Sequence, residues 1–187
     1  IQVPPHGLGA MRVGAWGTTA HDDCIRMIHP QADAGINFID TADVYAAGES
    51  EGIVGKALHG RRDDVVLATK FYIPMGDDPN MKGGSRRWII QEVENSLRRL
   101  DTDYTDLYQI HRPVPGTDID ETLGALSDLI HSGKVRALGS STFPAEDIVE
   151  AQWLADRRRR QRLPCAHPPV SFLRRALEAR ARPPGGD

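Results

Sequence analysis

Four polar side chains stand at the ends of three successive strand-like runs of the sequence. They are Asp40, Tyr45, Lys70 and His111. Parallel strands that alternate with helices all point the same way, so their C-terminal ends meet at one face of the sheet. We therefore expect a carboxylate, a phenol, an ammonium and an imidazole to converge at that face. Such a set is suited to proton transfer.

Each of the four groups has a chemical role that fits the others. Tyr45 is the candidate general acid, and the positive charge of Lys70 would stabilise the phenolate left behind. Asp40 would hold Lys70 through an ion pair, and His111 would donate a hydrogen bond that orients a carbonyl. A carbonyl held in this way can accept a hydride on carbon while Tyr45 protonates its oxygen. Because no side chain supplies a hydride, this scheme requires a nicotinamide cofactor.

Each residue also has an ordinary structural explanation when it is taken alone. Asp40 could cap a turn, Tyr45 could be a half-buried aromatic residue, and His111 could be a plain loop residue. Lys70 is harder to explain, because an ammonium at the end of a buried strand must be paired or solvated. Placement of the four at consecutive strand ends favours a functional site.

Strand-like and helical segments alternate along the chain at intervals of about 30 residues, the length of a βαβ unit. The expected strands are 36–40, 64–71, 104–111 and 135–142, with a short strand within 3–17 and a sixth over 163–171. The expected helices are 21–35, 49–60, 85–100, 118–133 and 144–160. This order predicts a parallel sheet with helices outside it.

The alternation is typical of an α/β fold of the parallel (β/α) TIM-barrel type. A complete barrel takes about 250 residues, whereas this chain has 187. We therefore expect an incomplete barrel with about five to six of the eight βα units. Such a sheet has two unpaired edges, which would favour self-association.

Local signals place several helix ends. Ser85 is the expected cap of the helix 85–100, and Asp118 with Glu121 would form a capping box at the start of the helix 118–133. Pro30 fits poorly inside the helix 21–35, because proline lacks the backbone N–H that a helix interior needs.

Charge divides the chain into two parts, a body over 1–160 and a basic tail over 161–187. The net charge is −3, yet residues 157–182 contain nine arginines and one acid, Glu178. Nucleic-acid or membrane-surface binding is one hypothesis for this cluster. A solvated helix end is favoured, because cations suit the C-terminal pole of a helix and no aromatic residues are interleaved. We therefore expect neither a nucleic-acid nor a membrane partner.

Composition and cysteine content indicate a globular protein without metal. The chain is 40% hydrophobic and 26% charged, and it has no apolar run of about 18 residues that could cross a membrane. Cys24 and Cys165 have no metal-ligand or redox spacing, and the N-terminus lacks the features of a signal peptide. Reduced thiols in the cytoplasm are the expected state.

Four linked motifs resemble the aldo-keto reductase family. They are FIDTADVYAAGESEGIVGKAL, VVLATKF, SLRRLDTDYTDLYQIHRP and GKVRALGSSTF, which occur in the family's order over about residues 7–160. The resemblance implies a (β/α)8 barrel that binds NADPH at its C-terminal face. It also implies reduction of a small aldehyde or ketone.

The resemblance also assigns residues to roles. The family's catalytic tetrad falls on Asp40, Tyr45, Lys70 and His111, and Asp40 is also expected to bind the cofactor. Ser141 and Thr142 match the positions that bind the nicotinamide carboxamide. Trp16 matches a wall of the substrate pocket that Tyr45 and His111 also line, although core packing is an alternative for Trp16.

The sequence departs from the family pattern after residue 160. Where the family has Gln-x-x-Tyr on its sixth strand, this chain has His167 followed three positions later by Val170. The imidazole of His167 could still bond to the carboxamide, but Val170 offers no ring to stack on the nicotinamide. The alternative hypothesis is a non-catalytic homologue that acts as a binding or regulatory subunit.

Overall fold

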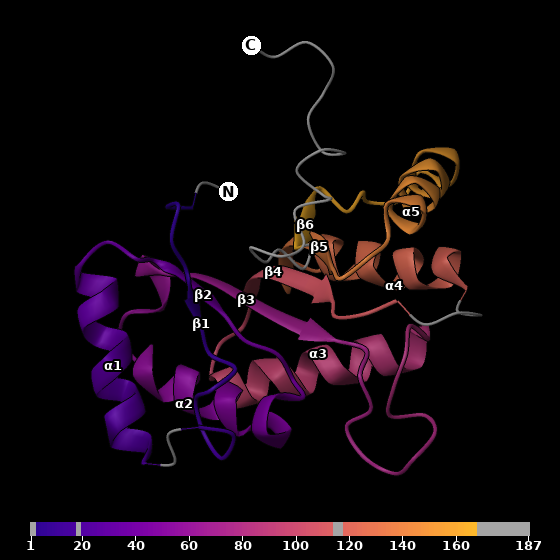
Figure 1. Cartoon of the computed structure of the whole chain (residues 1–187). Helices are drawn as coiled ribbons and strands as arrows, with labels where there is room; N and C mark the ends of the chain where they lie inside the picture. The colour runs from indigo at the N-terminus through magenta and orange to yellow at the C-terminus, as the bar shows by residue number, and fades with distance from the viewer. Residues whose placement is uncertain (1–2, 18–19, 114–117, 168–187) are drawn as a thin grey trace, which may run out of the picture.

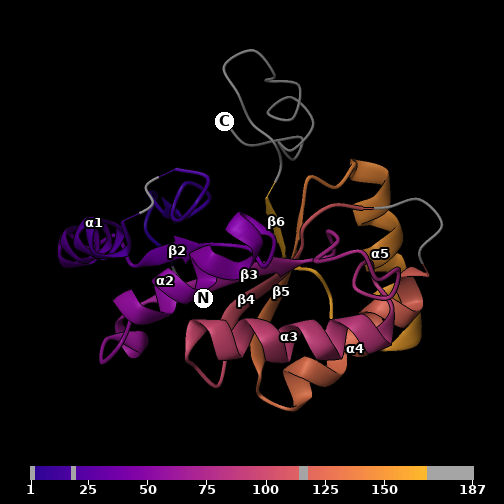
Figure 2. The same ribbon diagram turned by 90° about the horizontal axis from the view of Figure 1, so that it is seen from below.

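Six strands form one parallel sheet in which the order across the sheet follows the order along the chain. The computed structural model describes residues 3–17, 20–113 and 118–167. The strands are β1 (Leu8–Gly9), β2 (Phe38–Asp40), β3 (Val66–Phe71), β4 (Thr105–Ile110), β5 (Val135–Ser141) and β6 (Cys165–His167). The sheet curls, and the helices surround it on its outer side (Figures 1 and 2). The expected incomplete barrel of the TIM type is confirmed.

Five α-helices connect the strands. They are α1 (His21–Asp33), α2 (Glu49–Ala57), α3 (Arg86–Leu100), α4 (Ile119–His131) and α5 (Ala145–Arg158). Pro30 does lie inside α1. It is tolerated because the helix ends three residues later, so only bonds of the last turn are affected.

The helix caps agree with expectation in part. Ser85 caps α3 and Asp118 caps α4 through side-chain oxygens that accept backbone N–H groups. The second half of the expected capping box is wrong, because the Glu121 carboxylate does not accept the backbone N–H of Asp118. Its Oε1 accepts a hydrogen bond from the backbone N of Arg86 at 2.8 Å, which joins the starts of α3 and α4.

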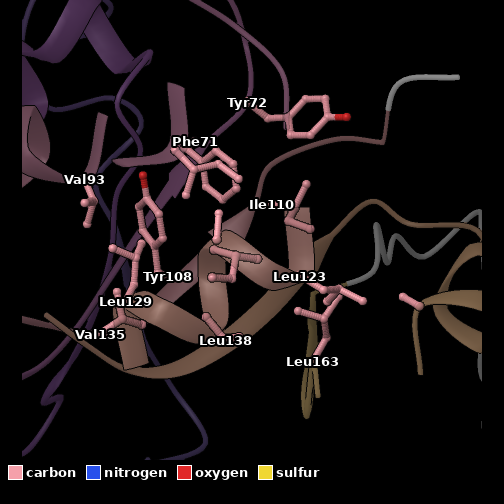
Figure 3. Close-up of a cluster of buried hydrophobic side chains, with 14 of the residues drawn as sticks. Phe71, Tyr72, Val93, Tyr108, Ile110, Leu123, Leu129, Val135, Leu138 and Leu163 are labelled. Atoms are coloured by element: carbon pink, nitrogen blue, oxygen red, sulfur yellow. The ribbon is translucent and has the colours of Figure 1, made fainter. Parts of the chain in front are cut away.

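The larger hydrophobic core lies between strands β3 to β5 and helices α3 to α5 (Figure 3). At its centre the rings of Phe71 and Tyr108 stack with centroids 4.8 Å apart. A second cluster packs α1 and α2 against β2 and β3. Both cores support the sheet beneath its C-terminal edge, where Asp40 and Lys70 lie at the ends of β2 and β3.

The sixth strand exists where the sequence suggested one. Its described part is Cys165–His167, paired in parallel with β5. Residues 163 and 164 of the expected strand precede it without strand structure, and residues 168–171, which include Val170, lie outside the described residues with the rest of the tail.

A clamp of charged and aromatic residues joins three strands at their N-terminal ends. The guanidinium carbons of Arg62 and Arg136 each lie 4.1 Å from the ring centroid of Tyr104. Arg62 also donates to Asp106 at 2.8 Å, and the same Asp106 oxygen accepts from the backbone N of Leu67. The clamp fixes the starts of β3, β4 and β5 relative to one another.

A buried ionic network lies between α2, α3 and β3. Arg99 donates to Glu51 and to Glu92, in both cases at 2.6 Å, and both acids are almost fully buried. Thr69 donates to the other oxygen of Glu51 at 2.6 Å. Gly48, at the start of α2, has φ +92° and passes so close that an added Cβ would lie 2.7 Å from Cδ of Arg99. Glycine is required there for conformation and for space.

Asp43 is a third acid beside this network, and it lacks a full set of partners. One carboxyl oxygen accepts from the backbone N of Val44 at 2.6 Å. The other is buried with no partner among the described residues. Burial, followed by the nearby charges of Glu51 and Glu92, raises the pKa of Asp43 well above its usual range. The folded chain therefore keeps the proton of Asp43 to a higher pH than the unfolded chain does.

The first prediction concerns how this acid makes stability depend on pH. Above the pKa of an unfolded aspartate, about 3.9, the unfolded chain loses a proton that the folded chain keeps. Stability therefore falls as pH rises toward the raised folded pKa, by at most about 1.4 kcal/mol per pH unit. Asp43→Asn removes this loss, so urea denaturation should show a gain in stability that grows as pH rises above about 4.

The exposed aspartate variant Asp22→Asn is the control and should show no such growing gain. Equal pH dependence of Asp43→Asn and the unmodified chain would mean that folding does not raise the pKa of Asp43.

Candidate active site

The ammonium of Lys70 is the centre of the polar cluster at the C-terminal ends of the strands. Lys70 is only 1% exposed, although it ends a strand next to the solvent-facing edge of the sheet. Its Nζ donates to Asp40 Oδ2 at 2.5 Å and to the backbone oxygen of Thr41 at 2.9 Å. It also lies 3.4 Å from the hydroxyl of Tyr45. The structure thus brings Asp40, Tyr45 and Lys70 together, as the strand ends predicted.

Tyr45 is carried over Lys70 by an unusual turn between β2 and α2. Residues Tyr45–Gly48 form a short 3-10 segment in which Ala46 and Ala47 have φ +50° and +55°. Left-handed backbone is unfavourable for residues with a Cβ, so this turn stores strain that the packing around it must offset. Sequence patterns gave no sign of it, because alanine has no preference for left-handed backbone, and the expected helix 49–60 begins only after this turn.

His111 faces Tyr45 across the site. Their ring centroids lie 5.6 Å apart with the planes at 85°. Burial, then the charges of Lys70 and Arg112, lower the pKa of His111 to about 4. The imidazole is therefore neutral at pH 7, with one donor and one acceptor nitrogen.

The surroundings of His111 indicate which nitrogen carries the proton. Its Nδ1 is buried and has no partner among the described residues. A proton on Nδ1 would bury an unpaired N–H, which is costly. The tautomer with its proton on Nε2 therefore has the lower energy, so Nε2 is the hydrogen-bond donor.

Trp16 lies beside this cluster and is not a core residue. Its side chain is 51% exposed, and its ring centroid lies 6.2 Å from that of Tyr45. The alternative of core packing is therefore wrong for Trp16. The loop that carries it is held by Glu49, which accepts from the backbone N of Ala15 at 2.8 Å and contacts His21 Nε2 at 2.7 Å.

Gln109 was missed by the sequence analysis and contacts the cluster directly. It is 1% exposed on β4, and its Nε2 donates to Asp40 Oδ1 at 3.0 Å. The signal was present: Gln109 is a polar residue in a buried strand, two positions before His111. Alternation along a strand puts residues two apart on the same face.

Three further residues from the sequence analysis lie together at the ends of β5 and β6. Ser141 pairs with His167, and the backbone N of Thr142 donates to the backbone oxygen of His167 at 3.0 Å. Thr142 has φ +57° and donates through Oγ1 to the backbone oxygen of His111 at 3.1 Å. Within the described part of the chain, the Ser141 hydroxyl has no hydrogen-bond partner. A hydroxyl of this kind fits a ligand amide, such as the carboxamide of nicotinamide.

The described arginines after residue 156 are mostly engaged with the protein itself. Arg158 and Arg160 each lie 3.6 Å from Asp120, and Arg162 forms a two-bond pair with Asp156. Arg157 lies over the ring of Trp153 at 4.9 Å. These side chains lie at or just after the C-terminal end of α5, where cations suit the negative pole of the helix.

Two kinds of feature are absent from the residues that the structure describes. No group of three or more His, Cys, Asp or Glu side chains there could hold a metal ion. No described helix is both long enough and apolar enough to pass through a bilayer.

A sequence model of the Aldo/keto reductase family matches residues 6–179. The match extends beyond residue 160, where the motifs place the end of the resemblance. Aldo-keto reductase YhdN of Bacillus subtilis is 40% identical over 187 aligned residues, which cover 98% of this chain and 55% of YhdN. A probable voltage-gated potassium channel subunit beta of Oryza sativa is 39% identical over 151 residues, covering 77% of this chain and 46% of that protein. The chain thus spans about half the length of these curated relatives.

Solved structures give the same result. Aldo-keto reductase AKR11C1 from Bacillus halodurans, in its holo form, superposes with a TM-score of 0.82 at 35% identity, covering 96% of this chain and 57% of that one. An aldo/keto reductase from Klebsiella pneumoniae, solved with NADP and acetate, superposes with a TM-score of 0.70 at 36% identity. In that case 81% of this chain and 50% of the other are covered.

The second prediction tests the charge state of His111. Its imidazole signals in NMR spectra, assigned with His111→Gln, should keep the shifts of the neutral ring between about pH 8 and about pH 5.5. Lys70→Met removes one of the positive charges that oppose protonation, so it should move the midpoint upward. A midpoint near the ordinary value of about 6.5 in the unmodified chain would contradict the burial of this ring.

Proposed function

We propose, from the premise that the chain belongs to the Aldo/keto reductase family, that it carries the active site of an NADPH-dependent carbonyl reductase. The observation that supports this most is the contact of one buried ammonium, Lys70, with both the Asp40 carboxylate and the Tyr45 hydroxyl. The substrate would be a small aldehyde or ketone, which is reduced to an alcohol.

Tyr45 is the proposed proton donor. When the carbonyl carbon accepts a hydride, negative charge develops on the carbonyl oxygen, and the Tyr45 hydroxyl delivers its proton to that oxygen. Lys70 Nζ, 3.4 Å from the hydroxyl, stabilises the phenolate that results. Asp40 keeps the ammonium in place on the side away from the substrate.

His111 is the proposed orienting group. As a neutral imidazole with its proton on Nε2, it can donate to the carbonyl oxygen without adding a second cation beside Lys70. Trp16, next to Tyr45, would limit the substrate on the open side. The rings of His111, Trp16 and Tyr45 would together favour a substrate with a flat carbonyl group within reach of the Tyr45 hydroxyl.

NADPH, when bound, supplies the hydride and becomes NADP+. The unpartnered Ser141 hydroxyl and the adjacent Thr142 would bond to the carboxamide of its nicotinamide ring, with His167 on the neighbouring strand. The choice of NADPH over NADH follows the family resemblance, and the Klebsiella pneumoniae relative was solved with NADP. We also propose a cytoplasmic location, and self-association through β1 and β6, the outermost of the described strands.

A binding or regulatory role without turnover is the second candidate. The similarity to proteins named as potassium channel beta subunits supports it. The two candidates differ in one measurable respect, because both allow NADPH to bind but only the first allows it to be consumed with an aldehyde.

The third prediction follows from the role of Tyr45. With 4-nitrobenzaldehyde as substrate, Tyr45→Phe should lower kcat for NADPH consumption by at least about 100-fold, since a general acid contributes about that much. NADPH affinity, measured by calorimetry, should stay within about threefold, a difference of less than 1 kcal/mol.

Tyr104→Phe, which removes a tyrosine hydroxyl at the opposite end of the sheet, is the matched control and should keep its activity. An unmodified chain that binds NADPH but consumes it no faster than Tyr45→Phe would favour the binding role.

A further inference from the structure

Gln109 belongs to a row of paired residues that crosses four strands. The row lies directly under the polar cluster of Asp40, Tyr45 and Lys70. Lys70 pairs with Gln109, Gln109 with Gly139, and Gly139 with Cys165. Paired residues on neighbouring strands project to the same face of a sheet. Lys70 and Gln109 therefore enter the interior of the curled sheet side by side.

Gly139 gives the Gln109 side chain its space. A Cβ at residue 139 would lie 3.1 Å from Cγ of Gln109 and 3.3 Å from Cβ of Cys165. Both distances are shorter than ordinary van der Waals contact. The absence of a side chain at Gly139 thus lets the Gln109 amide occupy the position from which it reaches Asp40.

The Asp40 carboxylate is held from two directions. Oδ2 accepts from Lys70 Nζ at 2.5 Å, and Oδ1 accepts from Gln109 Nε2 at 3.0 Å. A carboxylate bound through one oxygen can still rotate about its side-chain torsion, whereas a second bond to the other oxygen fixes its plane. The buried amide of Gln109 supplies that second bond.

We propose that Gln109 is a positioning residue for proton delivery: it fixes the Asp40 carboxylate, which in turn holds Lys70 at the Tyr45 hydroxyl. This inference rests on the proposed function for its kinetic consequence. Gln109 touches neither substrate nor cofactor in this role, and it acts through Asp40 and Lys70.

A simpler role for Gln109 is to fill space. It lines a mostly apolar cavity of about 440 Å³ inside the curled sheet, together with residues such as Phe38, Leu107 and Cys165. A residue that only fills this cavity would affect stability when replaced, but it would not affect the proton-transfer step.

The fourth prediction separates these roles with Gln109→Met, which keeps length and volume but removes the donor. We expect kcat with 4-nitrobenzaldehyde to fall about tenfold, equivalent to about 1.4 kcal/mol in the barrier, while KM and NADPH affinity stay within about twofold. The solvent deuterium isotope effect on kcat should increase, because proton transfer becomes more rate-limiting.

Cys165→Ala is the matched control, since it alters the same cavity and row without removing a bond to Asp40. It should leave kcat and the isotope effect unchanged. A fall in thermal stability of Gln109→Met with no change in kcat or in the isotope effect would overturn the proposal. If Gln109→Met does not fold, Gly139→Ala displaces the Gln109 amide without removing it and should lower kcat in the same direction.

A measurement without turnover keeps the proposal separate from the proposed function. The Lys70 ammonium is buried and donates hydrogen bonds to two oxygens, so it should give a slowly exchanging 15N-detected signal in the unmodified chain and in Cys165→Ala. Gln109→Met should broaden or remove that signal. An unchanged signal in Gln109→Met would overturn the positioning role, whereas absence of turnover in the unmodified chain would count only against the reductase.

Discussion

A positive charge buried at the end of β3 is the constraint on which the rest of the site depends. The Lys70 ammonium is removed from water, so carboxylate and carbonyl oxygens must lie within hydrogen-bond reach of it. Asp40 and Thr41, at the end of β2, provide them, and this need ties the register of β2 and β3 to the turn that follows. These hydrogen bonds offset the cost of burying the charge, and they also hold the ammonium next to the Tyr45 hydroxyl.

Two sets of contacts fix the segment that carries Tyr45: those at the site and those of Arg99 on its other side. Arg99 lies under the start of α2, passes close to Gly48 and bonds to two buried acids, Glu51 and Glu92. Buried ion pairs add little net stability, but loss of one partner is costly. We infer that the network acts mainly to define the position of the strained turn at Ala46 and Ala47, which local preferences would not produce.

The fold and the central site could be predicted because both follow from periodic patterns. Alternating segments gave the parallel sheet, and the direction of its strands gave the meeting of Asp40, Tyr45, Lys70 and His111. The errors concern contacts between distant segments. The Glu121 carboxylate bonds to α3 instead of the start of its own helix, and Gln109 reaches Asp40 across β3. Such partners depend on how elements pack, which spacing along one element does not encode.

The clamp of Arg62, Tyr104 and Arg136 has a consequence for how this protein can change. It secures the strands at the edge of the sheet that is remote from Asp40, Tyr45 and Lys70. Segments at the opposite edge, such as the largely exposed residues 73–82 between β3 and α3, contribute little to holding the strands together. Barrel folds acquire new specificities by varying such loops. A library that exchanges this segment should therefore yield many folded variants, which makes it a natural entry point for laboratory evolution.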